Sequence, residues 1–300
     1  QFNLESVPEA EMLSKVAASL GRTAPVGFRV NPDVEAGSHA KISTGAAHNK
    51  FGVSIAEALD AYARARELPG LEVQGVAVHI GSQLTSLDPL ERAFRRVGEL
   101  IAELRTAGHS IRVADLGGGL GVPYDPEAPL PPSPQAYGRM IAEVANGWEV
   151  RFVFEPGRLI VGNAGVLLTE VIRVKPGAAH PFLIVDAAMN DLMRPSLYDA
   201  WHAIEAVAPT GERMIANVVG PVCETGDTFA TGRSLDHAEA GDLVIFRTAG
   251  AYAATMASTY NSRPLTPEVL VEGSKWAVVR PRVDVQTLID ADAIPDWLRA

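Results

Sequence analysis

The segment Val73-Gln-Gly-Val-Ala-Val-His79-Ile-Gly-Ser-Gln83 decides the fold, because its arrangement returns twice further along the chain. Each time, an apolar strand-like run ends in a short loop that begins with a glycine or a polar residue. The residues at these places are His79, Gly117 and Glu155, and neighbouring ones lie 38 positions apart. That interval fits one strand, one helix and two loops, the repeating unit of a (β/α) barrel. Such barrels keep their chemistry at the C-terminal ends of the strands, so we expect a functional site there.

The two later loops are Leu116-Gly-Gly-Gly-Leu-Gly121 and Glu155-Pro-Gly-Arg158. Glycine lets backbone N–H groups approach a phosphate closely, so we expect a phosphorylated ligand over the barrel mouth. Each loop alone is weak support, because glycine runs are common in turns and a lone histidine is more often structural. Together, an imidazole, two phosphate-cradling loops and a carboxylate are the parts that a pyridoxal phosphate site needs, since the carboxylate keeps the pyridine nitrogen protonated.

Composition indicates a globular protein with a substantial core, since 47% of the 300 residues are hydrophobic and 21% are charged. The formal net charge of −10 argues against nucleic acid or an anionic membrane as the partner. A single cysteine, Cys223, excludes an internal disulfide and suits a reducing cytosol. No apolar run approaches the roughly 20 residues of a membrane span, and no secretory signal opens the chain. We therefore expect a cytoplasmic protein that binds neither nucleic acid nor membrane, and we expect no metal site.

Strands and helices alternate up to about residue 160. The expected strands end near Leu4, Asn31, His79, Leu116 and Phe154. The expected helices cover residues 7–20, a stretch from the Ser54 cap to about 68, a stretch from Asp88 to the Gly108 stop, and residues 135–145. The polar stretch 35–50 is interpreted as a lid.

After about residue 165 the pattern changes to short strands joined by Gly, Pro and Asp turns. Those strands are expected at 166–174, 182–185, 214–219, 243–247 and 275–279, and one helix is expected at 192–206. We therefore predict an α/β plus β fold with two domains. Residues 1–163 form an incomplete (β/α)8 barrel, and residues 164–300 form a mostly β domain.

Further motifs follow along the whole chain. They are Arg29-Val-Asn-Pro32, Ser38-His-Ala-Lys-Ile-Ser-Thr-Gly45 with Lys50-Phe-Gly52, Asn190-Asp-Leu-Met-Arg-Pro-Ser-Leu-Tyr198, Gly220-Pro-Val-Cys-Glu224, Gly250-Ala-Tyr252 and Met256-Ala-Ser-Thr-Tyr-Asn-Ser-Arg-Pro264. With the three strand-end loops, these motifs resemble in content and order those of the diaminopimelate decarboxylases, which belong to the alanine racemase-like, fold-type III class of pyridoxal phosphate enzymes. So many motifs in family order are far more specific than any one of them.

The resemblance implies a set of cofactor-binding positions. His79 stacks on the ring of pyridoxal 5'-phosphate, and Glu155 pairs with the pyridine nitrogen. The positions around the phosphate are Ser82, Gly118, Gly119, Pro156, Gly157, Arg158 and Tyr252, the last closing over it.

The resemblance also implies how a substrate is held. Cys223 protonates the carbanion left after CO2 departs, so that Cys223 and His79 are the catalytic positions. Arg158, Arg194 and Tyr198 bind the carboxylate at the end that is kept, and Glu224 binds the amine there. The substrate-binding positions are thus Arg158, Arg194, Tyr198, Glu224 and Tyr252. In the family, the segment of Cys223 and Glu224 reaches the partner's site, which implies a homodimer with shared active sites.

One part of the family pattern is absent. The family joins its cofactor to a lysine in a Tyr-Ala-x-Lys-Ala-Asn strand, and this sequence has no such motif. Its lysines are Lys15, Lys41, Lys50, Lys175 and Lys275. The expected barrel strands match the fourth to the eighth of the family barrel, whereas the lysine lies on the second. We therefore expect an N-terminally truncated chain, inactive as given, of an enzyme that decarboxylates meso-2,6-diaminopimelate to L-lysine in lysine biosynthesis.

Two other functions stay open at this point. One is decarboxylation of another basic or polyamine-related amino acid, such as ornithine, lysine or carboxynorspermidine. Arg194 favours diaminopimelate, because a substrate with two carboxylates needs a cation deep in its pocket. The other is a non-catalytic homologue that keeps the pyridoxal phosphate fold, and the absent lysine is its only support.

Overall fold

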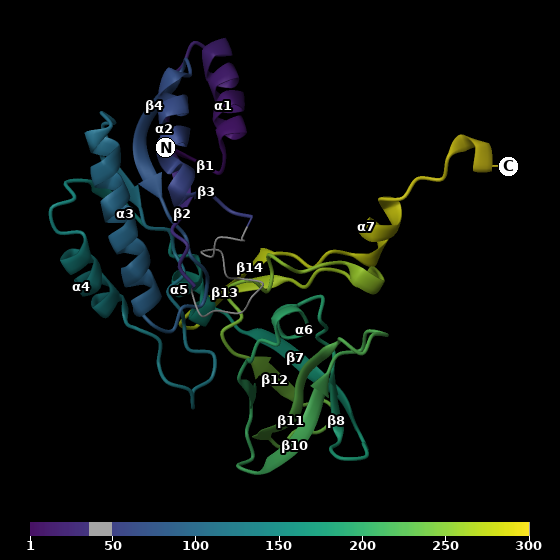
Figure 1. Ribbon diagram of the computed structural model, residues 1–300. Helices are drawn as coiled ribbons and strands as arrows, with labels where there is room; N and C mark the ends of the chain where they lie inside the picture. The colour runs from purple at the N-terminus through teal and green to yellow at the C-terminus, as the bar shows by residue number, and fades with distance from the viewer. Residues whose placement is uncertain (36–49, 300) are drawn as a thin grey trace. The chain divides into compact units, whose positions relative to one another are not determined.

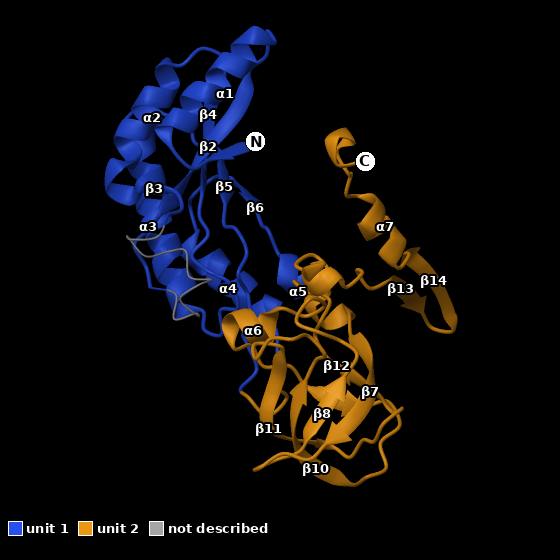
Figure 2. Ribbon diagram, turned by 90° about the vertical axis from the view of Figure 1, so that its right-hand side faces the viewer, with its two compact units in different colours: residues 1–123, 129–160 blue, residues 124–128, 161–300 orange. Residues whose placement is uncertain are grey.

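The structure, a computed structural model, describes residues 1–35 and 50–299. They form two compact units (Figure 2). The first unit consists of residues 1–123 and 129–160, and the second of residues 124–128 and 161–300. The stretch predicted as a lid falls almost wholly on residues 36–49, outside the described residues.

A parallel sheet forms the centre of the first unit (Figure 1). Its strands, in spatial order, are β1 (Phe2–Leu4), β2 (Ala24–Asn31), β4 (Leu71–Ala77), β5 (Val113–Asp115) and β6 (Arg151–Val153), and the short β3 (Val53–Ser54) pairs with β2. All these pairs are parallel. The predicted strands are confirmed, with ends that differ by at most two residues.

Helices connect the strands of the first unit. They are α1 (Val7–Ser19), η2 (Ile55–Glu57) continuing into α2 (Ala58–Glu67), α3 (Asp88–Thr106), α4 (Pro134–Val144) and α5 (Gly157–Val161), whose last residue belongs to the second unit. Helix α3 has one apolar face, and its residues Leu90, Phe94, Val97, Ile101 and Leu104 are buried in the core. Tyr62 on α2 is fully buried and links two strands, because its hydroxyl donates to Gly75 O (2.7 Å) and accepts from Phe28 N (3.2 Å).

The second unit is mostly β. Its main sheet has the order β11 (Thr228–Asp236), β10 (Arg213–Val219), β8 (Phe182–Val185), β7 (Leu167–Lys175), β12 (Leu243–Phe246) and β9 (Ile204–Ala206). Only β10 and β8 pair in parallel. A separate hairpin joins β13 (Glu268–Glu272) to β14 (Lys275–Arg280), and α7 (Val285–Asp290) and η5 (Asp296–Leu298) follow. The predicted strands of this unit are confirmed, whereas β9, β11 and β13 were not anticipated.

The helix predicted at 192–206 is wrong. Helix α6 covers only Arg194–Tyr198, because Asp199 adopts a left-handed backbone with φ of 51° and ends it. The segment Ile204–Ala206 instead forms β9 and pairs antiparallel with β12. Across residues 1–35 and 50–299, no helix combines the length and apolar character that crossing a membrane requires.

Candidate active site

The ends of β4, β5 and β6 lie side by side in register. Ala77 is the Cα partner of Asp115, and Asp115 is the partner of Val153. The loops that start after them therefore meet at one edge of the sheet, as the even spacing of His79, Gly117 and Glu155 predicts. The loops also bond to each other, since Glu155 N–H donates to Gly117 O at 2.7 Å.

His79 is held once through its ring and once through its backbone. The Gly118 N–H donates to its Nδ1 at 3.3 Å, so the proton of the neutral ring lies on Nε2. Arg29 donates from Nη2 to the His79 carbonyl oxygen at 3.1 Å. Burial lowers the pKa of His79, and the positive charge of Arg29 lowers it further, against an opposing effect of Asp115. A neutral ring fits a role in stacking on an aromatic cofactor.

Three carboxyl residues line the same cavity as His79, namely Glu5, Asp115 and Glu155. Asp115 is 5% exposed and accepts hydrogen bonds from Gly117 N (2.9 Å) and Asn3 Nδ2 (2.7 Å). Burial raises the pKa of Glu155, and the charge and hydrogen bond of Asp115 raise it further, while Arg29 opposes the shift. The cavity has a volume of about 180 Å³ and is lined by Asn3, Glu5, Arg29, Ala77, Val78, His79, Asp115 and Glu155. A cationic ring N–H placed beside Glu155 would relieve the repulsion between the carboxyl groups of Glu155 and Asp115.

Some glycines at this edge are required by the protein itself. A Cβ added to Gly118 would lie 2.2 Å from Glu155 O, and one added to Gly119 would lie 2.3 Å from Gly81 O. Gly119 also has a φ of +110°, a backbone conformation that other residues rarely adopt. These two glycines therefore allow the loops to pack against each other.

Gly157 has no such reason in the protein. A Cβ added there meets no atom within 4 Å, and its φ lies outside the left-handed region. The residue follows Pro156 and begins α5, next to Arg158, whose Nη2 donates to Ser82 Oγ at 3.0 Å. Backbone N–H, guanidinium and hydroxyl groups are the donors that phosphate prefers. The open space at Gly157, next in the chain to Arg158 with its hydrogen bond to the Ser82 hydroxyl, is compatible with the phosphate of pyridoxal 5'-phosphate.

The remaining predicted site residues belong to the second unit. Arg194 is 5% exposed, donates from Nη1 to His202 Nε2 at 2.8 Å, and has its Cζ 4.2 Å from the centre of the Tyr124 ring. Because Arg194 can only donate, the His202 proton lies on Nδ1, which donates to Arg247 O at 2.9 Å. Tyr198 lies one turn later, at the end of α6. Sequence reasoning missed His202 and Tyr124, since neither lies in a recognisable motif.

Cys223 and Glu224 are exposed neighbours on a loop between β10 and β11. A hydrogen bond from the Tyr260 hydroxyl to Glu224 raises the pKa of Tyr260, and the negative charge of Glu224 raises it further. Tyr260 was not among the predicted site residues. Tyr252 is 41% exposed and has a φ of +60°, a strained conformation for a residue with a side chain.

The lysines of the described residues do not line the cavity at His79. Lys15 on α1, Lys50, Lys175 on β7 and Lys275 on β14 are all exposed. Lys41 lies outside the described residues.

Comparisons with known proteins agree on one family. The profile "Pyridoxal-dependent decarboxylase, pyridoxal binding domain" matches residues 1–162, and "Pyridoxal-dependent decarboxylase, C-terminal sheet domain" matches residues 84–250. A diaminopimelate decarboxylase of Zymomonas mobilis is 54% identical over 298 residues, 99% of this chain and 71% of that relative. One of Neisseria meningitidis serogroup A is 49% identical over 282 residues, 94% of this chain and 69% of that relative. The crystal structure of diaminopimelate decarboxylase from Helicobacter pylori complexed with L-lysine has a TM-score of 0.91 at 40% identity, covering 96% of this chain and 72% of that one.

Proposed function

This chain belongs to the diaminopimelate decarboxylases, a family of pyridoxal-dependent decarboxylases, and from that premise we propose that it carries the site for decarboxylation of meso-2,6-diaminopimelate to L-lysine. The observation that carries the proposal is that loops at one end of the parallel sheet carry the neutral His79, the carboxyl group of Glu155 and the open space at Gly157. The reaction belongs to lysine biosynthesis.

Different residues at this end of the sheet would bind different parts of the cofactor. Pyridoxal 5'-phosphate, when bound, supplies an electron sink for the carbanion that remains after CO2 leaves. The His79 ring stacks on the cofactor, with its Nδ1 fixed by Gly118 N–H. Glu155 accepts the pyridine N–H and so holds that nitrogen protonated. Gly118, Gly119 and Gly157 let the backbone approach the phosphate, and Arg158 and Ser82 donate to it.

The second unit supplies the substrate-binding groups. Arg194 offers a guanidinium to the carboxylate that the substrate keeps, and its stacking on Tyr124 with the bond to His202 fixes the direction of that group. Tyr198 and Tyr252 are the other substrate-binding positions proposed in this unit, and Arg158 is the one proposed in the first unit. Glu224 binds the retained amine, and Cys223 donates a proton to the carbon that lost CO2.

We infer a homodimer in which Cys223 and Glu224 serve the partner's site. The exposure of both side chains supports this assignment, since neither is buried within its own unit. We further infer that strands β1, β2, β4, β5 and β6 correspond to five strands of an eight-stranded barrel, in line with their parallel order. On this view residues 1–163 are the cofactor domain, residues 164–300 are the β domain, and the enzyme works in the cytoplasm.

The test uses ligands that need no lysine for attachment. The phosphopyridoxyl group is linked by a stable amine bond to the α-nitrogen of either diaminopimelate or lysine, and binding of each adduct to the chain is measured by calorimetry. We expect the diaminopimelate adduct to bind about 10-fold or more tightly, because only it offers Arg194 a second carboxylate.

Arg194→Ala should remove this preference and leave the lysine adduct little changed. Arg233→Ala is the matched control, because Arg233 also stacks on an aromatic ring, Trp201 at 4.3 Å, and also bonds to His202, through its carbonyl oxygen at 3.0 Å. Equal binding of the two adducts by the unaltered chain would contradict the substrate assignment. If neither adduct bound to the chain, the assignment of a pyridoxal phosphate site would be contradicted.

A further inference from the structure

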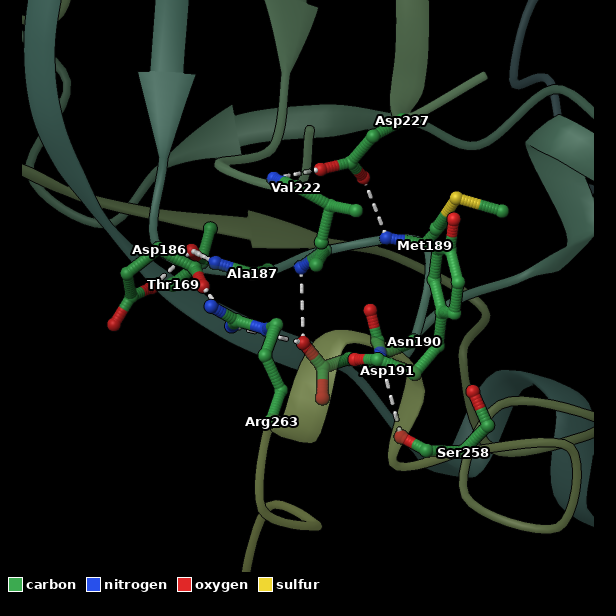
Figure 3. Close-up of polar contacts among 12 residues, drawn as sticks. Thr169, Asp186, Ala187, Met189, Asn190, Asp191, Val222, Asp227, Ser258 and Arg263 are labelled. Carbon is green, nitrogen blue, oxygen red and sulfur yellow. Dashed lines mark hydrogen bonds and ion pairs between the residues drawn. The ribbon is translucent and has the colours of Figure 1, made fainter. Parts of the chain in front are cut away.

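The loop that carries Cys223 and Glu224 is folded around one buried carboxylate. We call residues Gly220–Asp227 the cysteine loop. Asp227, its last residue, is only 3% exposed, although Cys223 and Glu224 point to solvent. Its Oδ2 accepts from the Val222 N–H at 2.7 Å, and its Oδ1 accepts from the Met189 N–H at 2.6 Å (Figure 3). One carboxylate thus joins the residue before Cys223 to a segment more than 30 positions away.

The backbone closes tightly over this carboxylate. A Cβ added to Gly220 would lie 2.4 Å from Asp227 Oδ2, so the loop has no room for a side chain at its first residue. The Gly220 N–H donates to Asp227 O at 3.0 Å, and the Asp227 N–H donates to Glu224 O at 3.1 Å. The same residue therefore closes the loop through its main chain and through its side chain.

The segment that receives the other carboxylate oxygen is itself held firmly. It follows β8, and Asp191 accepts there from the Ala188 N–H at 2.9 Å. Arg263 donates to Asp186 O at 2.6 Å and lies 3.7 Å from the Asp191 carboxylate, which ties the segment to the chain after η4 (Tyr260–Ser262) (Figure 3). Asp227 therefore connects the cysteine loop to a fixed support.

The same segment is linked to Glu224 indirectly, through Tyr260. The buried Asn190 donates from Nδ2 to the carbonyl oxygens of Ser258 (3.1 Å) and Tyr260 (2.8 Å). The Tyr260 hydroxyl in turn bonds to the Glu224 carboxylate. The segment after β8 thus fixes the loop backbone through Asp227 and the Glu224 side chain through Tyr260.

We propose that Asp227 is a positioning residue, whose buried carboxylate sets the backbone of the cysteine loop and thereby the placement of Cys223 and Glu224. The inference rests on the proposed function only where it gives these two side chains a catalytic purpose. The hydrogen bonds from Val222 and Met189 need two acceptor oxygens on one side chain, which only a carboxylate of this length supplies.

The first measurement is made on the unaltered chain. Val222 is partly exposed, but its N–H donates to Asp227, whereas the Thr225 N–H donates to no acceptor within residues 1–35 and 50–299. The Val222 amide should therefore exchange with solvent at least 10-fold more slowly than the Thr225 amide. Assigned NMR spectra of the whole chain give both rates. Equal rates would overturn the proposal without any substitution.

The second measurement compares variants. Asp227→Asn keeps the shape but replaces one acceptor by a donor, and Asp227→Glu keeps the charge but is too long for the space under Gly220. Asp227→Glu should speed Val222 exchange at least 10-fold, and Asp227→Asn should do so for Val222 or for Met189, because its single acceptor oxygen can serve only one of them. Both should change the pH profile of Cys223 alkylation, which is read directly because the chain has one cysteine. Both variants should also return the pKa of Tyr260 towards its ordinary value, because the displaced Glu224 carboxylate no longer accepts a hydrogen bond from the Tyr260 hydroxyl.

Asp236→Asn is the matched control, since the Asp236 carboxylate also accepts a backbone N–H, that of Ala206 at 3.1 Å, while its other hydrogen bond comes from Arg213 and not from the cysteine loop or its support. It should leave the exchange, alkylation and tyrosine titration unchanged. A wild-type profile for Asp227→Glu would show that charge alone matters and would overturn the proposal, as would an equal response to Asp236→Asn. None of these readouts needs a cofactor, so they remain interpretable if the decarboxylase assignment fails.

Discussion

Gly157→Ala tests whether the open space at the start of α5 is reserved for a ligand. The added methyl group meets no protein atom within 4 Å, and the backbone there is not left-handed. Alanine is favoured over glycine within helices by about 0.5–1 kcal/mol, so the free energy of unfolding should stay equal or rise by at most about 1 kcal/mol. The methyl group would, however, occupy the position that we assign to the phosphate.

The loss of affinity follows from the contacts that the phosphate would lose. A hydrogen bond to a charged group contributes about 1.5–3 kcal/mol, so the loss of one such bond to the phosphate lowers affinity roughly 10- to 100-fold. The assay is calorimetric titration with the phosphopyridoxyl-lysine adduct, paired with chemical unfolding of the same preparations. Binding should fall while stability does not.

Two other glycines provide the controls. Gly138 on α4 also has nothing within 4 Å of an added Cβ, so Gly138→Ala should leave binding unchanged. Gly118→Ala would place a Cβ 2.2 Å from Glu155 O, and overpacking of this kind costs about 1–3 kcal/mol of folding stability. Unchanged binding by Gly157→Ala would refute the assignment of this glycine to a phosphate.

Three further results are expected. Tyr62→Phe should lower the free energy of unfolding by about 2 kcal/mol, because the buried Gly75 carbonyl and Phe28 N–H lose their partner; denaturant unfolding measures it, and an unchanged midpoint would contradict it. The pKa of His79 lies below its ordinary value, so its contribution to stability is complete above the unfolded pKa of about 6.5 and is lost as pH falls through the lowered folded pKa. NMR titration of the ring gives that pKa, and His79→Gln should remove this part of the pH dependence. The 300-residue polypeptide with added pyridoxal phosphate should release no CO2 from diaminopimelate, since the lysines of the described residues are exposed and do not line the cavity at His79; robust release would contradict the expectation that this chain is inactive as given.

The regular part of the fold follows from local sequence signals. Equal spacing of His79, Gly117 and Glu155 predicts that their strands end together, and the register of Ala77, Asp115 and Val153 agrees. Strand β11 was not predicted, because Gly232 interrupts its apolar pattern and its pairing with β10 shifts register. Strand β9 was not predicted, because three residues are too few to show a hydrophobic periodicity. Its conformation is decided by tertiary pairing with β12.

The sequence predicts site residues by type but does not predict what holds each of them. A motif can mark Arg194, yet the sequence does not show that His202 and Tyr124 fix its guanidinium. Likewise Asp227 looks like an ordinary turn residue, and its burial depends on Met189, which is distant in the chain. Such partners are found only after folding, because the contacts join segments with no shared local pattern.

The charge of the chain raises the question of how an acidic protein holds an anionic cofactor and a dicarboxylate substrate. The net charge of −10 repels both at long range, so steering by the overall field would oppose binding. The proposed anion-binding groups are instead Arg158 and Arg194, which are only 7% and 5% exposed. Buried guanidinium groups act strongly over short distances and are screened little by salt. The direction of each guanidinium group is fixed within its own unit, since Arg158 donates to the Ser82 hydroxyl and Arg194 bonds to the His202 imidazole and stacks on the Tyr124 ring.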